Sequence, residues 1–209
     1  MGWSGRALHL VVLCLAFVPL SYPAAFAQRV EAMTAAEIRA LTKDAQSAAH
    51  GDKDEFILAL DARVRARWGD FESFPLSIVK REDLRIVLSS PYMTYRRTLA
   101  EYLRIGRPVA DVPWIRAVVI AIEPSRIDAP DITRIVVHRA GQEIGPVENL
   151  LRPMKFSNGS GGEATIHAGE IRFSLEAFAA GAQVTVTAVP AVGEPFVSTL
   201  NDAQLSVLK

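Results

Sequence analysis

Cysteine is the residue this chain most conspicuously lacks. The 209 residues include a single cysteine, Cys14, and it lies in the apolar N-terminal stretch. Without that stretch the chain can form no disulfide, and it has no thiol for nucleophilic catalysis or metal binding. Such a chain depends on its hydrophobic core for stability, and about 180 residues are enough to bury one.

An excess of either charge is also missing. The chain has 23 Lys and Arg side chains and 23 Asp and Glu side chains. This balance lacks the basic bias of nucleic-acid-binding proteins and the acidic bias of cation-binding ones. The glycine-rich run at 158–162 lacks the lysine of a phosphate-binding loop, and it precedes a predicted strand. We therefore expect no nucleic-acid partner and no cofactor.

No apolar run is long enough to cross a bilayer, and the longest one has the features of an export signal. Arg6 is the only charged residue before Arg29, the apolar run covers residues 10–20, and Ala25-Phe26-Ala27 follows. A charged start, a short apolar run and an A-x-A site predict a signal peptide over 1–27, cleaved between Ala27 and Gln28. The alternative is an uncleaved membrane anchor, but the run has about half the ~20 residues that a spanning helix needs. The sequence thus predicts a secreted or periplasmic protein with no transmembrane anchor in the mature chain.

Residues 28–83 predict a helical hairpin followed by a connector. Thr34 and Glu37 have the spacing of a capping box, and apolar residues at three- and four-residue steps continue to about Ala49. A second helix begins after Asp52 or Asp54 and ends at Gly69. Neither apolar stripe is wide enough to form a domain alone, so the hairpin must dock on another surface, either its own sandwich or that of a neighbouring molecule.

Residues 84–209 predict a β-rich region. The run Ile115–Ile122 is too short for a membrane span and rich in β-branched residues, which favours a strand buried on both faces. Ala140-Gly141 and Ala168-Gly169 each predict a two-residue hairpin turn. Residues 183–189 alternate between apolar and threonine positions, which is typical of a half-exposed strand.

These strands number about eight, and most connections are too short for parallel crossovers. The sequence therefore predicts a mainly β fold of the α+β class: an antiparallel β-sandwich at 84–209, preceded by the helical hairpin. The sandwich resembles the immunoglobulin fold in architecture. The tryptophan-and-cystine signature of antibody domains is absent because the mature chain has no cysteine.

Histidine and carboxylate residues offer one route to catalysis. His138 and His167 each end a predicted strand, so they could meet across a sheet with Glu163, Glu170 or Asp128. Such a group would serve a hydrolase or a metal site. The alternative is that both histidines face solvent at strand ends, because no metal-ligand spacing is present along the sequence.

A basic and aromatic segment is the candidate interaction surface. It contains Tyr92, Tyr95, Arg96, Arg97 and Arg104. Its spacing favours a helix from Thr94 to Ile105, whereas its aromatic and threonine content would also fit a strand. Residues 61–107 carry ten basic and six acidic side chains, whereas residues 156–209 carry two and five. This asymmetry would suit an acidic partner, either a protein or an envelope glycan. Alternatively, the tyrosines pack inward while the arginines are solvated on the opposite face.

These observations favour an exported, non-catalytic binding or structural module with no assigned catalytic, cofactor or metal residues. Two alternatives remain: an envelope hydrolase with a His and carboxylate site assembled in space, and a carrier of apolar ligands. In the carrier, Phe56, Leu60 and Trp68 would line a pocket between the helical hairpin and the sandwich.

Overall fold

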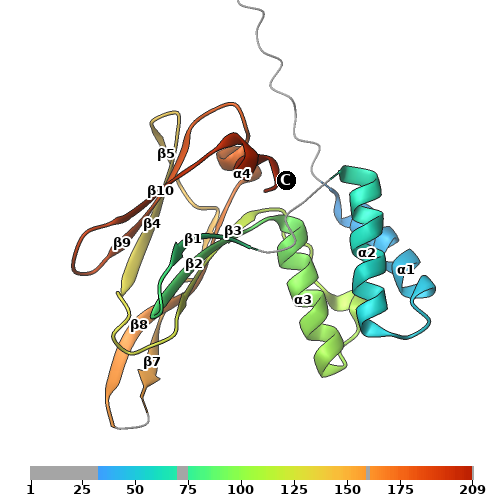
Figure 1. Ribbon diagram of the computed structural model, residues 1–209, viewed down its shortest axis with the longest axis horizontal. Coiled ribbons are helices and arrows are strands. Elements are labelled where there is room, and N and C mark those ends of the chain that lie inside the picture. Colours follow the sequence, from blue (N-terminus) through green and yellow to red (C-terminus); the bar gives the residue numbers. More distant parts are fainter. Residues whose placement is uncertain (1–32, 70–74, 159–160, 209) are drawn as a thin grey trace, which may run out of the picture.

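The computed structural model describes residues 33–69, 75–158 and 161–208. This part of the chain forms four α-helices and ten strands in two antiparallel sheets, with three of the helices side by side next to the sheets (Figure 1). The predicted α+β class with mostly β structure is confirmed. Residues 1–32 lie outside the described residues, so the signal peptide and its cleavage between Ala27 and Gln28 stay predictions. Among the described helices, none has the length and apolar content of a membrane span.

All strand pairings are antiparallel, and the strands form two sheets. The first sheet has the order β1-β2-β3-β8-β6, with β7 paired to β8. These strands are β1 (Leu76–Lys80), β2 (Leu84–Ser89), β3 (Val118–Pro124), β6 (Glu148–Asn149), β7 (Arg152–Ser157) and β8 (Glu163–Phe173). The second sheet has the order β10-β9-β4-β5, formed by β4 (Ile132–Arg139), β5 (Gln142–Ile144), β9 (Val184–Pro190) and β10 (Phe196–Leu200).

One hydrophobic core, the β core, is formed by side chains of both sheets. Its members alternate along each strand, such as Ile86 and Leu88 on β2 and Val184 and Val186 on β9. Two short helices complete it: the 3₁₀ helix η2 (Leu175–Phe178) and α4 (Asp202–Ser206). The period of two along the strands places these residues on one face, and this burial is the main stabilising contribution.

Strand β3 is buried on both faces, as the sequence predicts. Its residues Val118 to Ile122 are all buried, and Ile120 and Ile122 belong to the β core. Val119 and Ala121 lie on the opposite face of the sheet by alternation. Helix α3 (Pro91–Ile105) contacts β2 and β3, so we assign the covering of this second face to α3.

A second hydrophobic core, the helical core, joins α3 to the predicted hairpin. The hairpin consists of α1 (Ala35–Ala48) and α2 (Lys53–Trp68). Thr34 and Glu37 form the predicted capping box at α1, and Asp52 caps α2. The core residues come from all three helices, with Val112 beyond the 3₁₀ helix η1 (Val109–Asp111). Helix α3 therefore lies between the hairpin and the first sheet, where Figure 1 shows it in green.

One strand lies in the segment that the sequence predicts to be a connector. Leu76–Lys80 forms β1, which pairs with β2 and packs Leu76 and Ile78 against the β core. The pattern was obscured because the strand has five residues, follows Pro75 and contains a bulge between Ser77 and Val79. Such irregular edge strands give little periodic signal.

The hairpin turn predicted at Ala168-Gly169 is wrong, because β8 runs without interruption through both residues. A Cβ atom on Gly169 would lie 2.6 Å from the carbonyl oxygen of Leu150, so the glycine permits a close backbone approach instead of a turn. The turn predicted at Ala140-Gly141 is confirmed: both residues have positive φ and connect β4 to β5.

Candidate interaction surface

Helix α3 carries the predicted interaction segment, and its ends are encoded locally. The Ser90 hydroxyl accepts a hydrogen bond from the Met93 N–H at 3.2 Å, and Pro91 occupies the first turn. Gly106 ends the helix in the left-handed conformation, with φ of 71°. The helix therefore begins three residues before the predicted start at Thr94 and ends at the predicted residue, Ile105.

The two tyrosines of the predicted surface are buried. Tyr92 and Tyr95 are 3% and 2% exposed and belong to the helical core with Leu99. The Tyr95 hydroxyl lies 2.9 Å from the Thr42 hydroxyl, and its ring packs edge-on against Trp114. Both tyrosines must therefore be removed from the proposed surface. The helical spacing of 92, 95 and 99 places them on the face turned toward the hairpin.

Arg96 is also turned inward, where it forms a polar network with α2. Its Nε donates to both carboxylate oxygens of Asp61, at 2.9 and 3.0 Å. The Tyr92 hydroxyl donates to the same carboxylate at 2.6 Å. Burial, followed by this hydrogen bond, raises the pKa of Tyr92 above its usual value. The network fixes α3 on α2, so Arg96 acts as a structural residue.

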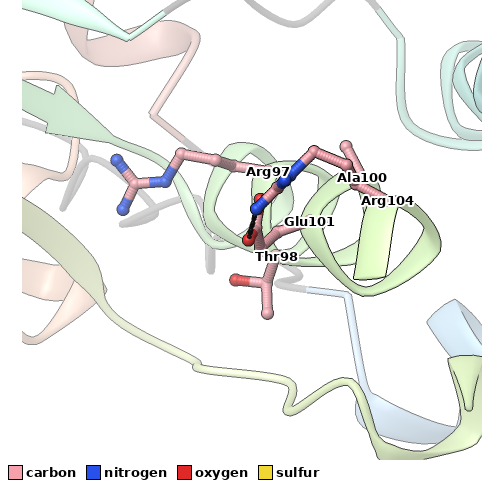
Figure 2. Close-up of a pocket in the computed structure, with 5 residues that line it drawn as sticks. All are labelled: Arg97, Thr98, Ala100, Glu101 and Arg104. Atoms are coloured by element: carbon pink, nitrogen blue, oxygen red, sulfur yellow. Dashed lines mark hydrogen bonds and ion pairs between the residues drawn. The ribbon is translucent and has the colours of Figure 1, made fainter. Parts of the chain in front are cut away.

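Arg97 and Arg104 remain on the exposed face of α3. Figure 2 shows both on the helix with Thr98, Ala100 and Glu101. These five residues line an open hollow of about 540 Å³. Arg104 donates to both carboxylate oxygens of Glu101, at 2.9 and 2.6 Å. The hydrogen bond from Arg104 lowers the pKa of Glu101 below its usual value. The charge of Arg104 is thus largely balanced within the helix.

Arg97 instead shares a carboxylate with an arginine of the first sheet. Its Nη1 lies 3.8 Å from Glu123 on β3, and the Nη1 of Arg85 on β2 lies 3.9 Å from the other oxygen of Glu123. Arg85 and Glu123 are direct cross-strand partners. Neither distance is that of a hydrogen bond, so both guanidinium groups keep donors for a further anion. We call Arg85, Arg97 and Glu123 the arginine surface.

Sequence reasoning missed Arg85 and Glu123 because their proximity depends on the β2–β3 register. Asp61 was also missed, although a signal was present. It stands among the apolar residues Leu60 and Val64 on the packed side of α2, where a carboxylate requires a buried partner.

The histidine and carboxylate candidates do not meet. Asp131 accepts hydrogen bonds from the backbone N–H and the Nδ1 side of His167, at 2.7 and 2.8 Å. His138 lies seven residues after Asp131 along β4, which corresponds to about 20 Å in an extended strand. His167 on β8 therefore lies beside the start of β4, whereas His138 lies near the other end of that strand.

The predicted carboxylate partners have other contacts. Asp128 pairs with Arg126 at 3.2 Å, and Glu170 accepts hydrogen bonds from Arg172. Glu163 lies exposed at the start of β8. Within the described residues, no group of three or more His, Cys, Asp and Glu side chains has the geometry of a metal site.

The residues assigned to an apolar-ligand pocket belong to the packed helical core. Phe56 and Leu60 are 3% and 0% exposed, and Trp68 packs half-buried against the same cluster. The described contacts of Phe56 and Leu60 are those of core side chains.

Comparison of the chain with protein-family models, with curated proteins and with solved structures gives no match.

Proposed function

We propose that this protein is an exported, non-catalytic interaction module that binds an acidic macromolecule through its arginine surface. The export part of this proposal rests on the sequence features of residues 1–27. The partner is a protein or an envelope glycan that presents several carboxylates, because guanidinium groups pair with carboxylates in a bidentate manner.

The observation that carries the proposal is the sharing of Glu123 by Arg85 and Arg97. One carboxylate faces two guanidinium groups, and their side chains are 54% and 49% exposed. The cluster has a net positive charge, and among the described residues its two guanidinium groups contact Glu123 only at ion-pair distances. A carboxylate of a partner could therefore bridge the two arginines without breaking an existing hydrogen bond.

The support of α3 also favours a binding role. The helix is held on one side by the Asp61–Tyr92–Arg96 network and contacts β2 and β3. Arg97 is therefore presented from a helix that is held between α2 and the first sheet. Groups on rigid elements lose less conformational freedom when they bind.

We further propose that the two sheets form an immunoglobulin-like sandwich. The order β2-β3-β8-β7 in the first sheet corresponds to strands A-B-E-D of that fold. The order β10-β9-β4-β5 in the second sheet corresponds to G-F-C with the added C′ strand. Strand β1 is an addition at the edge next to strand A. An experimental structure with a different strand order would contradict this assignment.

The binding proposal can be tested with two defined acidic polymers. Poly-glutamate represents an acidic polypeptide, and polygalacturonate represents an acidic glycan. Each is titrated into the purified protein at low and at physiological salt, with calorimetry as the readout. We expect saturable binding to at least one polymer, weakened by salt because the charges are exposed.

The matched variants are Arg85→Glu/Arg97→Glu and Arg134→Glu. Arg134 is also an exposed arginine, 62% exposed on β4, where it pairs with Glu143. The double variant should weaken binding by about tenfold or more, as the loss of two exposed ion pairs implies. Arg134→Glu should bind like the wild type. Absence of binding to both polymers, or equal losses in both variants, would refute the proposal.

A further inference from the structure

Basic side chains continue beyond the arginine surface toward the edge of the first sheet. Lys80 on β1 is the cross-strand partner of Arg85, which is in turn the partner of Glu123 on β3. Cross-strand partners lie side by side on one face of a sheet, with Cβ atoms about 5 Å apart. Lys80 therefore extends the arginine surface by one strand, to the edge strand of this sheet.

Helix α3 extends the same surface along its own axis. Arg97 and Arg104 are seven residues apart, which places them on one side of the helix and about 10 Å apart along it. Glu101 lies between them, and all three line the open hollow on α3. In Figure 2 the guanidinium group of Arg97 points away from the Arg104–Glu101 pair. Because Arg97 also contacts Glu123, it connects the hollow to the sheet.

The row of side chains on the sheet lies where the helix stops covering the strands. Val87 and Ala121 are cross-strand partners on the face that α3 covers, and both are buried. Two residues further along each strand, on the same face, Arg85 and Glu123 have side chains that are 54% and 41% exposed. A ligand can therefore contact this row from solvent and also touch α3.

We call the whole set the basic track. It consists of four cations and two carboxylates and has a net charge of +2: Lys80, Arg85, Arg97, Arg104, Glu101 and Glu123. Within the described part of the chain, Lys80 has no carboxylate within ion-pair distance. The track therefore attracts anions, although carboxylates stand between its cations.

These interleaved carboxylates restrict the chemistry of the partner. Ammonium and guanidinium groups only donate hydrogen bonds, whereas ionised carboxylates only accept them. A ligand that satisfies Arg97 and Glu123 together must present anions and hydrogen-bond donors side by side along its length. A chain of uronic acid sugars has this pattern, because each ring bears one carboxylate and free hydroxyl groups. Acidic side chains of a polypeptide bring only acceptors, which Glu101 and Glu123 repel.

The edge of the sheet also disfavours a polypeptide. An extended peptide supplies regular backbone N–H donors by adding a strand to a sheet edge. The edge strand next to the track is β1, which has a bulge between Ser77 and Val79 and ends at the charged Lys80. Bulges and edge lysines block the addition of a strand.

We infer that the basic track binds a polyuronate, a chain of acidic sugars that lies across β1 and β2 and continues along α3. Carboxylates of successive rings pair with Lys80, Arg85 and Arg97. Hydroxyl groups between them donate to Glu123 and Glu101. The inference rests on the proposed function, because it assigns the acidic partner of the arginine surface to one chemical class.

The length of the basic track predicts how affinity depends on chain length. The sheet row from Lys80 to Glu123 covers two strand spacings, about 10 Å, and the helix adds about 10 Å from Arg97 to Arg104. This distance exceeds a single sugar ring. Each exposed ion pair contributes about 1 kcal/mol or less, so tight binding requires several rings at once.

Four ligands test the inference by calorimetry at low salt: a galacturonate disaccharide, the hexasaccharide, the fully methyl-esterified hexasaccharide and a hexaglutamate peptide with capped termini. We expect the hexasaccharide to bind about tenfold or more tightly than each of the other three. The disaccharide is too short, the ester lacks charge, and the peptide lacks hydroxyl donors.

The matched variants are Lys80→Glu and Lys155→Glu. Lys80 stands at the end of the basic track, whereas Lys155 is an exposed lysine on β7. Lys80→Glu should weaken hexasaccharide binding about threefold or more, as the loss of one exposed ion pair implies. Lys155→Glu should bind like the wild type. Thermal unfolding verifies that both variants retain the fold.

The outcomes separate this inference from the proposed function. Hexaglutamate binding as tight as hexasaccharide binding, and lost in Arg85→Glu/Arg97→Glu, would overturn the polyuronate inference and leave the proposed function in place. So would hexasaccharide binding that Lys80→Glu and Lys155→Glu change equally. Absence of binding to both the hexasaccharide and the hexaglutamate would overturn the inference and the proposed function together.

Discussion

The two hydrophobic cores of this protein differ in the side chains that fill them. The β core contains aliphatic and phenylalanine side chains from both sheets. The helical core instead includes two tyrosines and lies against buried polar groups. The buried polar side chains of the described chain are Thr42, Asp61, Ser89, Ser90 and Thr94, all in or beside its helices.

This difference reflects how each core fixes the arrangement of the helices or strands that pack in it. In the β core, strand alternation and register already decide which residues face inward, so non-directional burial is sufficient. In the helical core, the stripe of α1 is narrow, with Ile38, Thr42 and Ala45 as its buried residues. Directional contacts such as Tyr95 with Thr42 then fix how the helices face one another.

Truncation in the β core should give the largest loss of stability. Phe173 is fully buried and packs edge-on against Phe178, with ring centroids 6.2 Å apart. Phe173→Ala should lower the free energy of unfolding by about 4 kcal/mol, because it leaves a cavity in a closely packed core. Urea unfolding followed by circular dichroism measures this, and Leu58→Ala, at a site 66% exposed, serves as the control. A loss below about 2 kcal/mol would show that this core rearranges readily.

Breaking the polar network of the helical core should have the next largest effect. Asp61→Ala leaves the Arg96 charge and the Tyr92 hydroxyl without their carboxylate partner, so we expect a loss of about 3 kcal/mol in urea unfolding.

The apolar triple variant Asp61→Leu/Tyr92→Phe/Arg96→Met sharpens this comparison. Replacing a whole buried network by hydrocarbon is often neutral, so its stability should lie within about 1 kcal/mol of the wild type. If the triple variant is as unstable as Asp61→Ala, the network adds net stability to the fold. That outcome would contradict a role limited to fixing how α2 and α3 face one another.

Alkaline pH should destabilise the helical core selectively. Burial raises the pKa of both Tyr92 and Tyr95. The unfolded chain releases these protons near pH 10, whereas the folded chain retains them. Stability is therefore fully present below pH 10 and falls as the pH rises above it, with a limiting slope of about 1.4 kcal/mol per pH unit for a tyrosine that only the folded chain keeps protonated.

Urea unfolding at pH 8, 10 and 11 measures this decline, and tyrosinate absorbance reports ionisation directly. Tyr92→Phe should give a shallower decline above pH 10 than the wild type, whatever its stability at neutral pH. Equal slopes in both proteins would show that Tyr92 does not govern the alkaline transition.

Removing the helix caps should have the smallest effect. Thr34→Ala removes the capping box of α1 in the helical core, and Asn201→Ala removes that of α4 beside the β core. Each should cost about 1 kcal/mol in chemical unfolding, because a cap satisfies similar backbone groups in both settings. A cost at Thr34 well above that at Asn201 would show that the helical core depends more strongly on local helix stability.

Local sequence patterns were sufficient where one segment carries its own signal. The capping residue Thr34 and the turn at Ala140-Gly141 are both predicted and are confirmed. Each depends on hydrogen bonds or dihedral preferences within a few residues. Such signals are independent of how the rest of the chain packs.

Contacts between distant segments were not predictable in the same way. Gly169 has a turn-like sequence, but its conformation reflects the approach of Leu150 from another part of the chain. The candidate site shows the same limit: Arg97 and Arg104 were identified, whereas the pairing of Arg85 with Glu123 depends on strand register. Tyr92 was assigned to the surface because spacing defines the faces of a helix but not which face is covered.

The position of α3 has a consequence for dividing the chain. The sequence places the boundary between helical and β regions after residue 83, yet α3 follows that boundary and supplies Tyr92, Tyr95 and Leu99 to the helical core. A fragment beginning at residue 84 would expose these side chains to water. A fragment ending at residue 83 would contain α1 and α2 without the helix that completes their core. Neither fragment buries a complete hydrophobic core, so the helical and β regions form one folding unit.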